Sequence, residues 1–279
     1  MRLLFLISMV LIAFAGNSVL ARLALSGGDI GPWGFSLIRF LSGALILLLI
    51  SRPKTSWSSG RWSGAVALSA YGLFFSFAYL QLATGTGALL LFASVQLTML
   101  IIAFSRGERL SGLQWFGLVL AFSGLIYLMA PSVKAPSPFG ASLMVLSGIG
   151  WGVYSILGKS ADNPIARTAG NFTRAAILIT LLSPAALFWL PEARPSVTGL
   201  SLAILSGTTT SGLGYALWYF VLKKISMTTA ALSQLSVPVI AAIGGALFVF
   251  EPVSLAFALS CAVVLIGVGI ATIKPYQSP

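Results

Sequence analysis

Residues 212–251 hold two apolar runs joined by a short basic turn. The first run is rich in aromatic residues, the turn is the lysine pair at 223 and 224, and the second run ends at Glu251. A soluble domain cannot cover two such segments back to back, whereas a bilayer core requires about 20 apolar residues in each spanning helix. The stretch therefore predicts a pair of membrane helices with charged ends and with polar and aromatic side chains midway.

The same alternation of apolar runs and short polar turns continues along the whole chain. Hydrophobic residues make up 58% of the 279 residues and charged residues only 8%, which is typical of integral membrane proteins. We predict an all-α integral membrane fold with ten transmembrane helices in one compact bundle. The predicted spans are residues 3–24, 32–50, 62–81, 84–104, 112–130, 139–158, 168–190, 198–222, 228–250 and 254–273.

The positive charges indicate how the helices are oriented. Eleven Lys and Arg residues lie at one set of helix ends and three at the other, so the positive-inside rule places both termini in the cytoplasm. The expected location is the inner (cytoplasmic) membrane, as a multi-pass protein. The net charge of +11 does not predict a nucleic-acid partner, because the basic residues lie in turns between apolar runs. A signal peptide is the alternative for the first run, but an equivalent run recurs later and favours a membrane helix.

The chain also matches itself at a long offset. Glu108 and Glu251 end the fourth and ninth spans, and Arg39 and Arg174 lie at matching places in the second and seventh. Each half then has five spans, and because five is odd, the second half enters the membrane inverted. We expect one five-helix repeat over residues 1–130, a linker turn at 131–138, and a second repeat over 139–279. Inverted repeats are typical of secondary transporters, with the substrate site near the midplane.

The runs GALLLFASVQLTMLIIAFSRGERLSG and AALSQLSVPVIAAIGGALFVFEPVSL resemble each other and the drug/metabolite transporter superfamily, specifically its EamA-type ten-helix members. The resemblance covers essentially the whole chain in two copies, and GNSVLARLAL and GVYSILGKS share it. Within the family the chain looks most like bacterial exporters of aromatic and other neutral amino acids. It departs from the pattern where the helix proline, present as Pro238, is replaced by Gln96 in the first copy. The two halves therefore need not bend alike.

Aromatic and polar side chains within the spans are the candidate substrate-binding residues. Aromatic rings can stack on a substrate side chain or contact an ammonium group, and polar groups at membrane depth usually face the interior or a wet cavity. The alternatives are interfacial anchors for the aromatic residues and helix-to-helix hydrogen bonds for the polar ones. The candidates are Asn17, Tyr71, Tyr79, Ser94, Gln96, Trp151, Tyr154, Tyr215, Trp218, Tyr219 and Gln234.

Two further features have a structural and a functional interpretation. Arg39 and Arg174 lie about seven residues into their spans, roughly 10 Å deep, from where an arginine can snorkel to the headgroups. Snorkelling or hydrogen bonding near a gate is the favoured interpretation. Recognition of a substrate carboxylate is the more specific, functional alternative. The small residues of SGTTTSGLG, at 206–214, are typical of a helix-packing seam.

No Asp, Glu or His lies within the ten predicted spans, so the usual intramembrane proton carriers are absent. The hypothesis is a carrier that moves neutral or zwitterionic solutes down their own gradient. No catalytic residue, metal site or cofactor is expected, and the lone Cys261 excludes a disulfide framework.

The sequence therefore predicts a secondary transporter of aromatic and other neutral amino acids or similar small metabolites. It would be an exporter or a facilitative carrier that works by alternating access. Its partners would be the small-molecule substrate and the lipid bilayer, and a monomer would suffice. Efflux of drug-like or cationic compounds is the first alternative, although it would call for a buried carboxylate. An intramembrane enzyme would need acidic, Ser–His or metal-ligating groups, and the inverted repeat argues against a scaffold or receptor.

Overall fold

The computed structural model describes residues 2–105, 111–129, 136–158, 161–190, 192–225 and 233–272, which form helices and no strand. The predicted all-helical class is confirmed. The elements are α1 (Arg2–Ser26), α2 (Pro32–Ile50), α3 (Pro53–Ser59), α4 (Trp62–Ala78), α5 (Thr84–Ser105), α6 (Gly112–Met129), α7 (Pro138–Gly158), α8 (Pro164–Trp189), α9 (Val197–Leu205), the π-helix η1 (Ser206–Leu213), α10 (Gly214–Leu222), α12 (Val237–Phe248) and α13 (Leu255–Thr272).

Helices lie within all the predicted spans, with three local differences. The turn after residue 50 contains the helix α3, which begins at Pro53, where the fixed φ of proline suits a first helical position. Helix α8 begins four residues earlier than expected, because the Asn163 side chain caps it by accepting from the Ala166 N–H at 3.1 Å. The span at 198–222 is one rod that changes from α to π and back to α. Residues 226–232, which include the start of the span at 228–250, lie outside the described residues.

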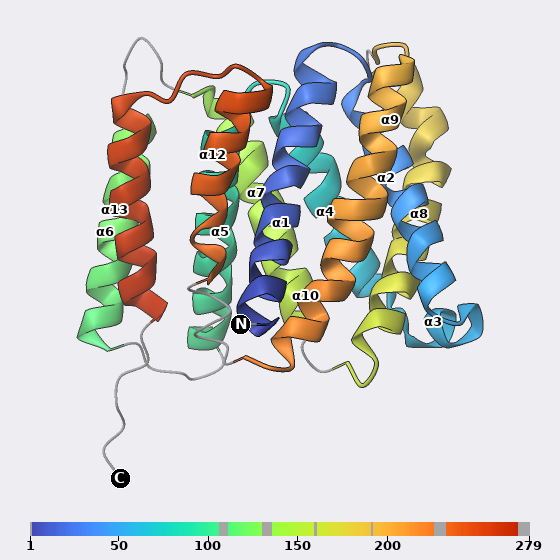
Figure 1. Ribbon diagram of the computed structural model, residues 1–279, viewed down its shortest axis with the longest axis horizontal. Helices are drawn as coiled ribbons and strands as arrows, with labels where there is room; N and C mark the ends of the chain where they lie inside the picture. Colours follow the sequence, from blue (N-terminus) through green and yellow to red (C-terminus); the bar gives the residue numbers. More distant parts are fainter. Residues whose placement is uncertain are drawn as a thin grey trace.

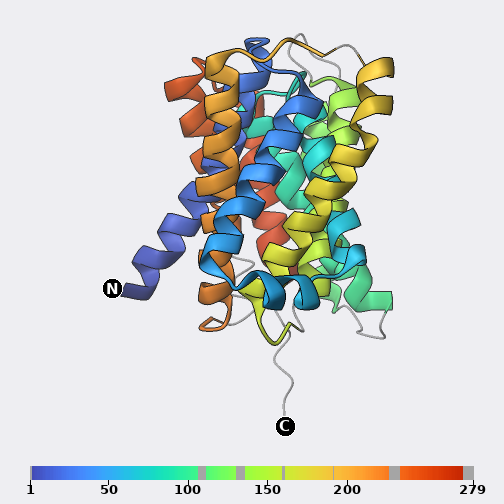
Figure 2. The same ribbon diagram turned by 90° about the vertical axis from the view of Figure 1, so that its right-hand side faces the viewer.

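The outer surface of the bundle is apolar in the way that a lipid environment requires. Four helices are long and apolar enough, by length and composition, to cross a membrane: Leu3–Ser26, Pro32–Ile50, Pro138–Gly158 and Pro164–Trp189. Leu45 on α2 and Leu181 on α8 are 62% and 71% exposed. Water would penalise so many exposed large apolar side chains, whereas hydrocarbon would not. Figure 2 shows the first turns of α1 leaning away from the bundle, where Leu4 and Phe5 are exposed.

The helices run side by side between two ends of the bundle (Figure 1). The loops that follow α1, α4, α8 and α12 lie at one end, which we call the Glu251 end. Helix α1 begins, α13 ends and the short α3 lies at the opposite end, which we call the α3 end. Helix α1 is central, since it packs against α5, α9, η1, α10 and α12, whereas α6 and α13 pair with each other at one flank.

Candidate functional site

A small cavity lies at the centre of the bundle, with walls from α1, α4, α5, α7 and α10. Its volume of about 10 Å³ has room for about one water molecule. A larger molecule fits only after the wall moves. The lining consists of Phe14, Asn17, Tyr71, Phe75, Leu91, Phe92, Trp151 and Tyr215.

Trp151 is the centre of the aromatic wall. Its ring centroid lies 4.9 Å from that of Tyr71 and 4.6 Å from that of Tyr215, and Phe14 meets its edge at 6.1 Å. Small residues beside it let α7 approach α4 closely. A Cβ on Gly150 would lie only 2.9 Å from the Tyr71 backbone nitrogen. The result is an apolar wall with the phenol hydroxyls of two tyrosines at its edge.

Arg39 lies directly behind those hydroxyls and is completely buried. Its Nε donates to Ser211 Oγ at 2.9 Å, and its Nη2 donates to the Tyr71 hydroxyl at 3.0 Å and to the Tyr215 hydroxyl at 3.4 Å. The guanidinium carbon also lies 5.0 Å from the ring centroid of Phe75. Its Nη1 has no hydrogen-bond partner, and no carboxylate of the described residues pairs with it. The snorkelling part of the favoured interpretation is therefore wrong for Arg39, because the surrounding helices enclose it, and its side chain instead makes hydrogen bonds.

Asn17 connects this cluster to the π-helix. Its Nδ2 donates to the Tyr71 hydroxyl at 3.2 Å, and its Oδ1 accepts from Ser206 Oγ at 2.6 Å and from Thr210 Oγ1 at 3.3 Å. Since Ser211 also comes from this segment, the stretch predicted as a packing seam supplies hydroxyls to both Asn17 and Arg39. π-helical turns are frequent at functional sites, where they re-aim side chains that a regular helix would place elsewhere.

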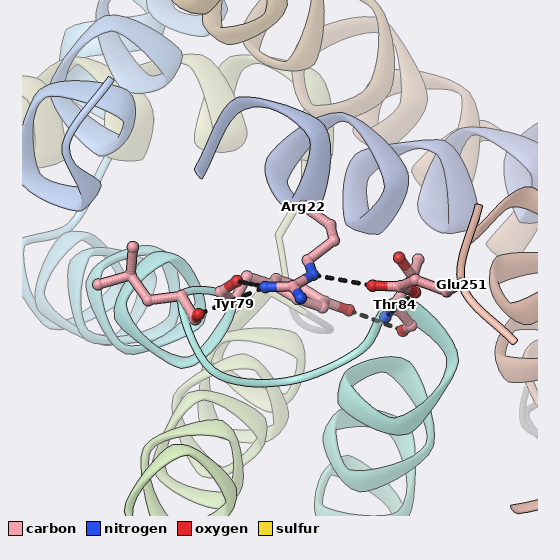
Figure 3. Close-up of polar contacts among 5 residues, drawn as sticks. Arg22, Tyr79, Thr84 and Glu251 are labelled. Atoms are coloured by element: carbon pink, nitrogen blue, oxygen red, sulfur yellow. Dashed lines mark hydrogen bonds and ion pairs between the residues drawn. The ribbon is translucent and has the colours of Figure 1, made fainter. Parts of the chain in front are cut away.

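The Glu251 end is closed by contacts between residues far apart in the sequence (Figure 3). Arg22 Nε donates to Glu251 Oε1 at 2.8 Å, and Arg22 Nη1 donates to the Tyr79 carbonyl at 2.8 Å. Glu251 Oε2 accepts from the Thr84 N–H at 2.7 Å. A positive φ of 57° at Phe250 turns the chain so that the carboxylate faces this cluster. One ion pair thus joins α1, the loop between α4 and α5, and the loop after α12.

Arg174 lies at the α3 end and has a different environment from Arg39. Its Nη1 donates to the Gly170 carbonyl at 3.1 Å and its Nη2 to the Trp57 carbonyl at 2.8 Å. Its guanidinium carbon lies 4.0 Å from the Trp57 ring centroid. The arginine therefore ties α8 to α3 through hydrogen bonds, and whether this place is a gate stays a prediction.

The structure brings four of the predicted site residues around this central cavity: Asn17, Tyr71, Trp151 and Tyr215. Two more lie one layer behind. Tyr154 packs on Trp151 at 5.5 Å between ring centroids, and Trp218 packs on Phe14 at 5.6 Å.

The other predicted site residues lie elsewhere in the bundle. The Tyr79 hydroxyl donates to the Thr84 carbonyl at 3.3 Å, close to the Glu251 end. Ser94 donates to a carbonyl of its own helix and faces α7 at Gly148, so it serves helix packing. The remaining three, Gln96, Tyr219 and Gln234, are buried but do not line the cavity.

Several residues of the cluster were not among the predicted site residues. Phe14, Phe75 and Phe92 are apolar residues within apolar helices, so no signal separates them from ordinary core residues. Ser206 and Ser211 did have a signal, since they are hydroxyl residues in a predicted membrane helix, but helix packing explained them equally well.

Comparison with known proteins identifies relatives of this chain. The model of the EamA-like transporter family matches residues 138–273. An uncharacterized protein of Pseudomonas aeruginosa is 46% identical over 257 residues, which cover 91% of this chain and 88% of that one. A probable terminal-alkyne amino-acid exporter of Streptantibioticus cattleyicolor is 22% identical, over 79% of this chain and 76% of the exporter.

A solved crystal structure has the same fold. It superposes with a TM-score of 0.64 at 21% sequence identity, over 95% of this chain and 96% of the other. The match extends beyond residues 138–273, so the first half of the chain shares the fold too.

Proposed function

Because this chain belongs to the EamA-like transporter family, we propose that it moves aromatic and other neutral amino acids, or similar small metabolites, across the bacterial inner membrane. The observation that most supports this proposal is the small central cavity, whose wall combines the Trp151 indole with the polar cluster of Asn17, Tyr71 and Tyr215. An aromatic wall suits an apolar side chain, and the polar cluster suits the charged end of an amino acid. The relative named as a probable amino-acid exporter supports the same substrate class.

The proposed architecture is two inverted five-helix repeats, at residues 1–130 and 139–279, with both termini in the cytoplasm. The contacts between helices support this, because they recur when each helix is replaced by its counterpart in the other half. Helix α4 packs on α7, and their counterparts, α9–α10 and α1, also pack together. Helix α5 packs on α7, and their counterparts, α12 and α1, pack together too. Helices α2 and α8 pack on each other, as do α6 and α13. The cavity lies where the two sets of helices meet, which suits a transport site.

The proposed mechanism is alternating access. The Arg22–Glu251 pair would hold the Glu251 end closed and would have to separate when that end opens. Asn17 at the cavity and Arg22 of the ion pair both lie on α1. Motion of α1 would therefore couple the ion pair to the cavity wall.

Efflux of cationic compounds is the competing function. A buried carboxylate would be needed to balance a cation, and among the residues that the structure describes none lines the cavity. The charged side chain closest to the cavity is instead the cationic Arg39, which would repel such a substrate.

The test is flux into proteoliposomes that contain the purified protein. A panel of labelled aromatic, aliphatic and charged amino acids would be measured without an ion gradient. Trp151→Ala tests the site, and Trp115→Ala, at a 52% exposed tryptophan on α6, is the matched control. Flux of neutral amino acids that falls about tenfold or more in Trp151→Ala alone would support the proposal. Flux of a cationic dye with none of any amino acid would overturn it.

A further inference from the structure

The central cluster has more hydrogen-bond donors than acceptors. Asn17 Nδ2 and Arg39 Nη2 are donors only, and both point to the Tyr71 hydroxyl. The hydroxyls of Tyr71 and Tyr215 lie 3.2 Å apart and share one hydrogen bond. Whichever phenol donates to the other, one phenol O–H is left without an acceptor among the residues that the structure describes. Both rings line the cavity, so the free donor is beside the space where a ligand would lie.

Arg39 adds a positive charge and a second unused donor. Its Nη1 is buried and has no partner, and no acidic residue of the described chain lies in its hydrogen-bonding shell. A buried charge without a counter-ion is costly at membrane depth, and hydroxyl dipoles and aromatic faces offset only part of that cost. The group that would complete this cluster must therefore be negatively charged and must accept hydrogen bonds.

From these observations we infer that the cavity recognises its substrate through a carboxylate, which is bound by Arg39 together with the Tyr71–Tyr215 hydroxyl pair. This inference rests on the proposed transport function and narrows its substrate class to organic monocarboxylates. The carboxylate oxygens accept from the unused phenol O–H and, once the wall has moved, from Nη1 of Arg39. A guanidinium fork is the donor geometry that matches a carboxylate.

The same cluster makes no provision for a substrate ammonium group. The Asn17 Oδ1 already accepts from Ser206 Oγ at 2.6 Å, and the described cavity lining contains no carboxylate. An amino group is therefore tolerated against the aromatic wall but is not required. Aromatic acids that lack the amino group should bind as well as the corresponding amino acids do.

Three probes of one shape separate these requirements. Phenylalanine has both charged groups, 3-phenylpropionate has only the carboxylate, and phenylalaninamide has only the ammonium group. Binding is measured as the change in melting temperature and tryptophan fluorescence of the purified full-length protein, and flux is measured in proteoliposomes. We expect the two acids to bind similarly and the amide to bind about 10- to 100-fold more weakly, the range for losing hydrogen bonds to a charged group.

The variants are Arg39→Gln and its matched control Arg174→Gln, which removes the other arginine of the spans. Arg39→Gln should abolish the preference for acids over the amide, and Arg174→Gln should retain it. Size-exclusion chromatography checks folding, and if Arg39→Gln does not fold, Tyr215→Phe and Ser211→Ala replace it. Those two keep the arginine and should each weaken acid binding severalfold without weakening amide binding.

The outcomes separate the inference from the transport function. Equal binding of acid and amide by the wild type, or an unchanged preference in Arg39→Gln, would overturn the inference even with amino acid flux intact. Binding of acids that depends on Arg39, without flux of any probe, would support the inference and overturn transport of this class. Neither binding nor flux would overturn both.

Discussion

Arg39 and Arg174 lie at matching places in the two predicted repeats, but the structure gives them different environments. Arg39 is enclosed at the centre of the bundle, where its partners are side-chain hydroxyls from other helices and one nitrogen is unused. Arg174 lies at the α3 end, where backbone carbonyls and the Trp57 ring surround it. Backbone carbonyls are permanent acceptors, so Arg174 is a structural tie. Each arginine has one buried nitrogen without a hydrogen-bond partner, Nη1 in Arg39 and Nε in Arg174, but only Arg39 donates to tyrosines that line the central cavity.

The largest expected effect separates charge from geometry at the two sites. Lysine keeps the positive charge but lacks the guanidinium fork. Arg39→Lys should weaken binding of a carboxylate substrate by about tenfold or more, because it cannot reach Ser211 and both tyrosines at once. Arg174→Lys should change it by less than about threefold, since an ammonium can still donate to one carbonyl. Equal effects at the two sites, measured by titration of tryptophan fluorescence, would break the comparison.

The tyrosine pair should give a smaller effect. Tyr71→Phe and Tyr215→Phe each remove one hydroxyl next to Arg39 and should weaken carboxylate binding by about 3- to 10-fold. Combined with Arg39→Gln, either change should add almost nothing, because the hydroxyls act together with the arginine. Tyr127→Phe, at a 51% exposed tyrosine on α6, is the control. Fully additive losses in the double variants would contradict a shared site.

The Glu251 end offers a test of closure. Glu251→Gln removes the charge of an ion pair whose side chains are 19% and 16% exposed, so we expect a moderate shift toward opening. The reporter is Leu91→Cys at the cavity, in a Cys261→Ala background. Its labelling by an impermeant maleimide should become about 3- to 10-fold faster, which corresponds to about 1 kcal/mol of differential stability.

Asp162→Asn, in the turn between α7 and α8, is the control for that measurement and should leave the labelling rate unchanged. The double variant Arg22→Glu with Glu251→Arg exchanges the two charges and should restore slow labelling. That result would assign the change in labelling rate to the ion pair. Unchanged labelling in Glu251→Gln would show that other contacts hold this end closed.

The smallest effect concerns the structural arginine. Trp57→Leu removes the ring that faces Arg174 and should lower stability by about 0.5–1 kcal/mol, with no change in substrate binding. The measurement is the melting temperature of the purified protein beside that of Trp115→Leu. A loss of carboxylate binding in Trp57→Leu would assign Arg174 a role at the site and weaken the contrast with Arg39.

Much of the helical fold could be predicted because its cause is local. Apolar runs of span length mark the helices, and the Gly, Pro and polar turns mark their ends. The helix α3 was missed because its sequence reads as a turn, and the π-helix was missed because its small residues fit a regular packing seam equally well. Four of the predicted site residues meet at the cavity, but Ser94, one turn from cavity-lining residues on the same helix, packs against α7 instead.

The amino-acid sequence by itself determined that this chain is a helical membrane protein, and it supplied the arginines and aromatic residues from which a site could be built. Only the tertiary structure decided which arginine is interior. The partner of Arg39, Ser211, is 172 residues away in the chain, and the hydroxyls of Tyr71 and Tyr215 come from helices in different halves. Residue spacing along one helix defines its faces but not its neighbours. Whether a buried charge is satisfied depends on those neighbours, and therefore on how the helices pack.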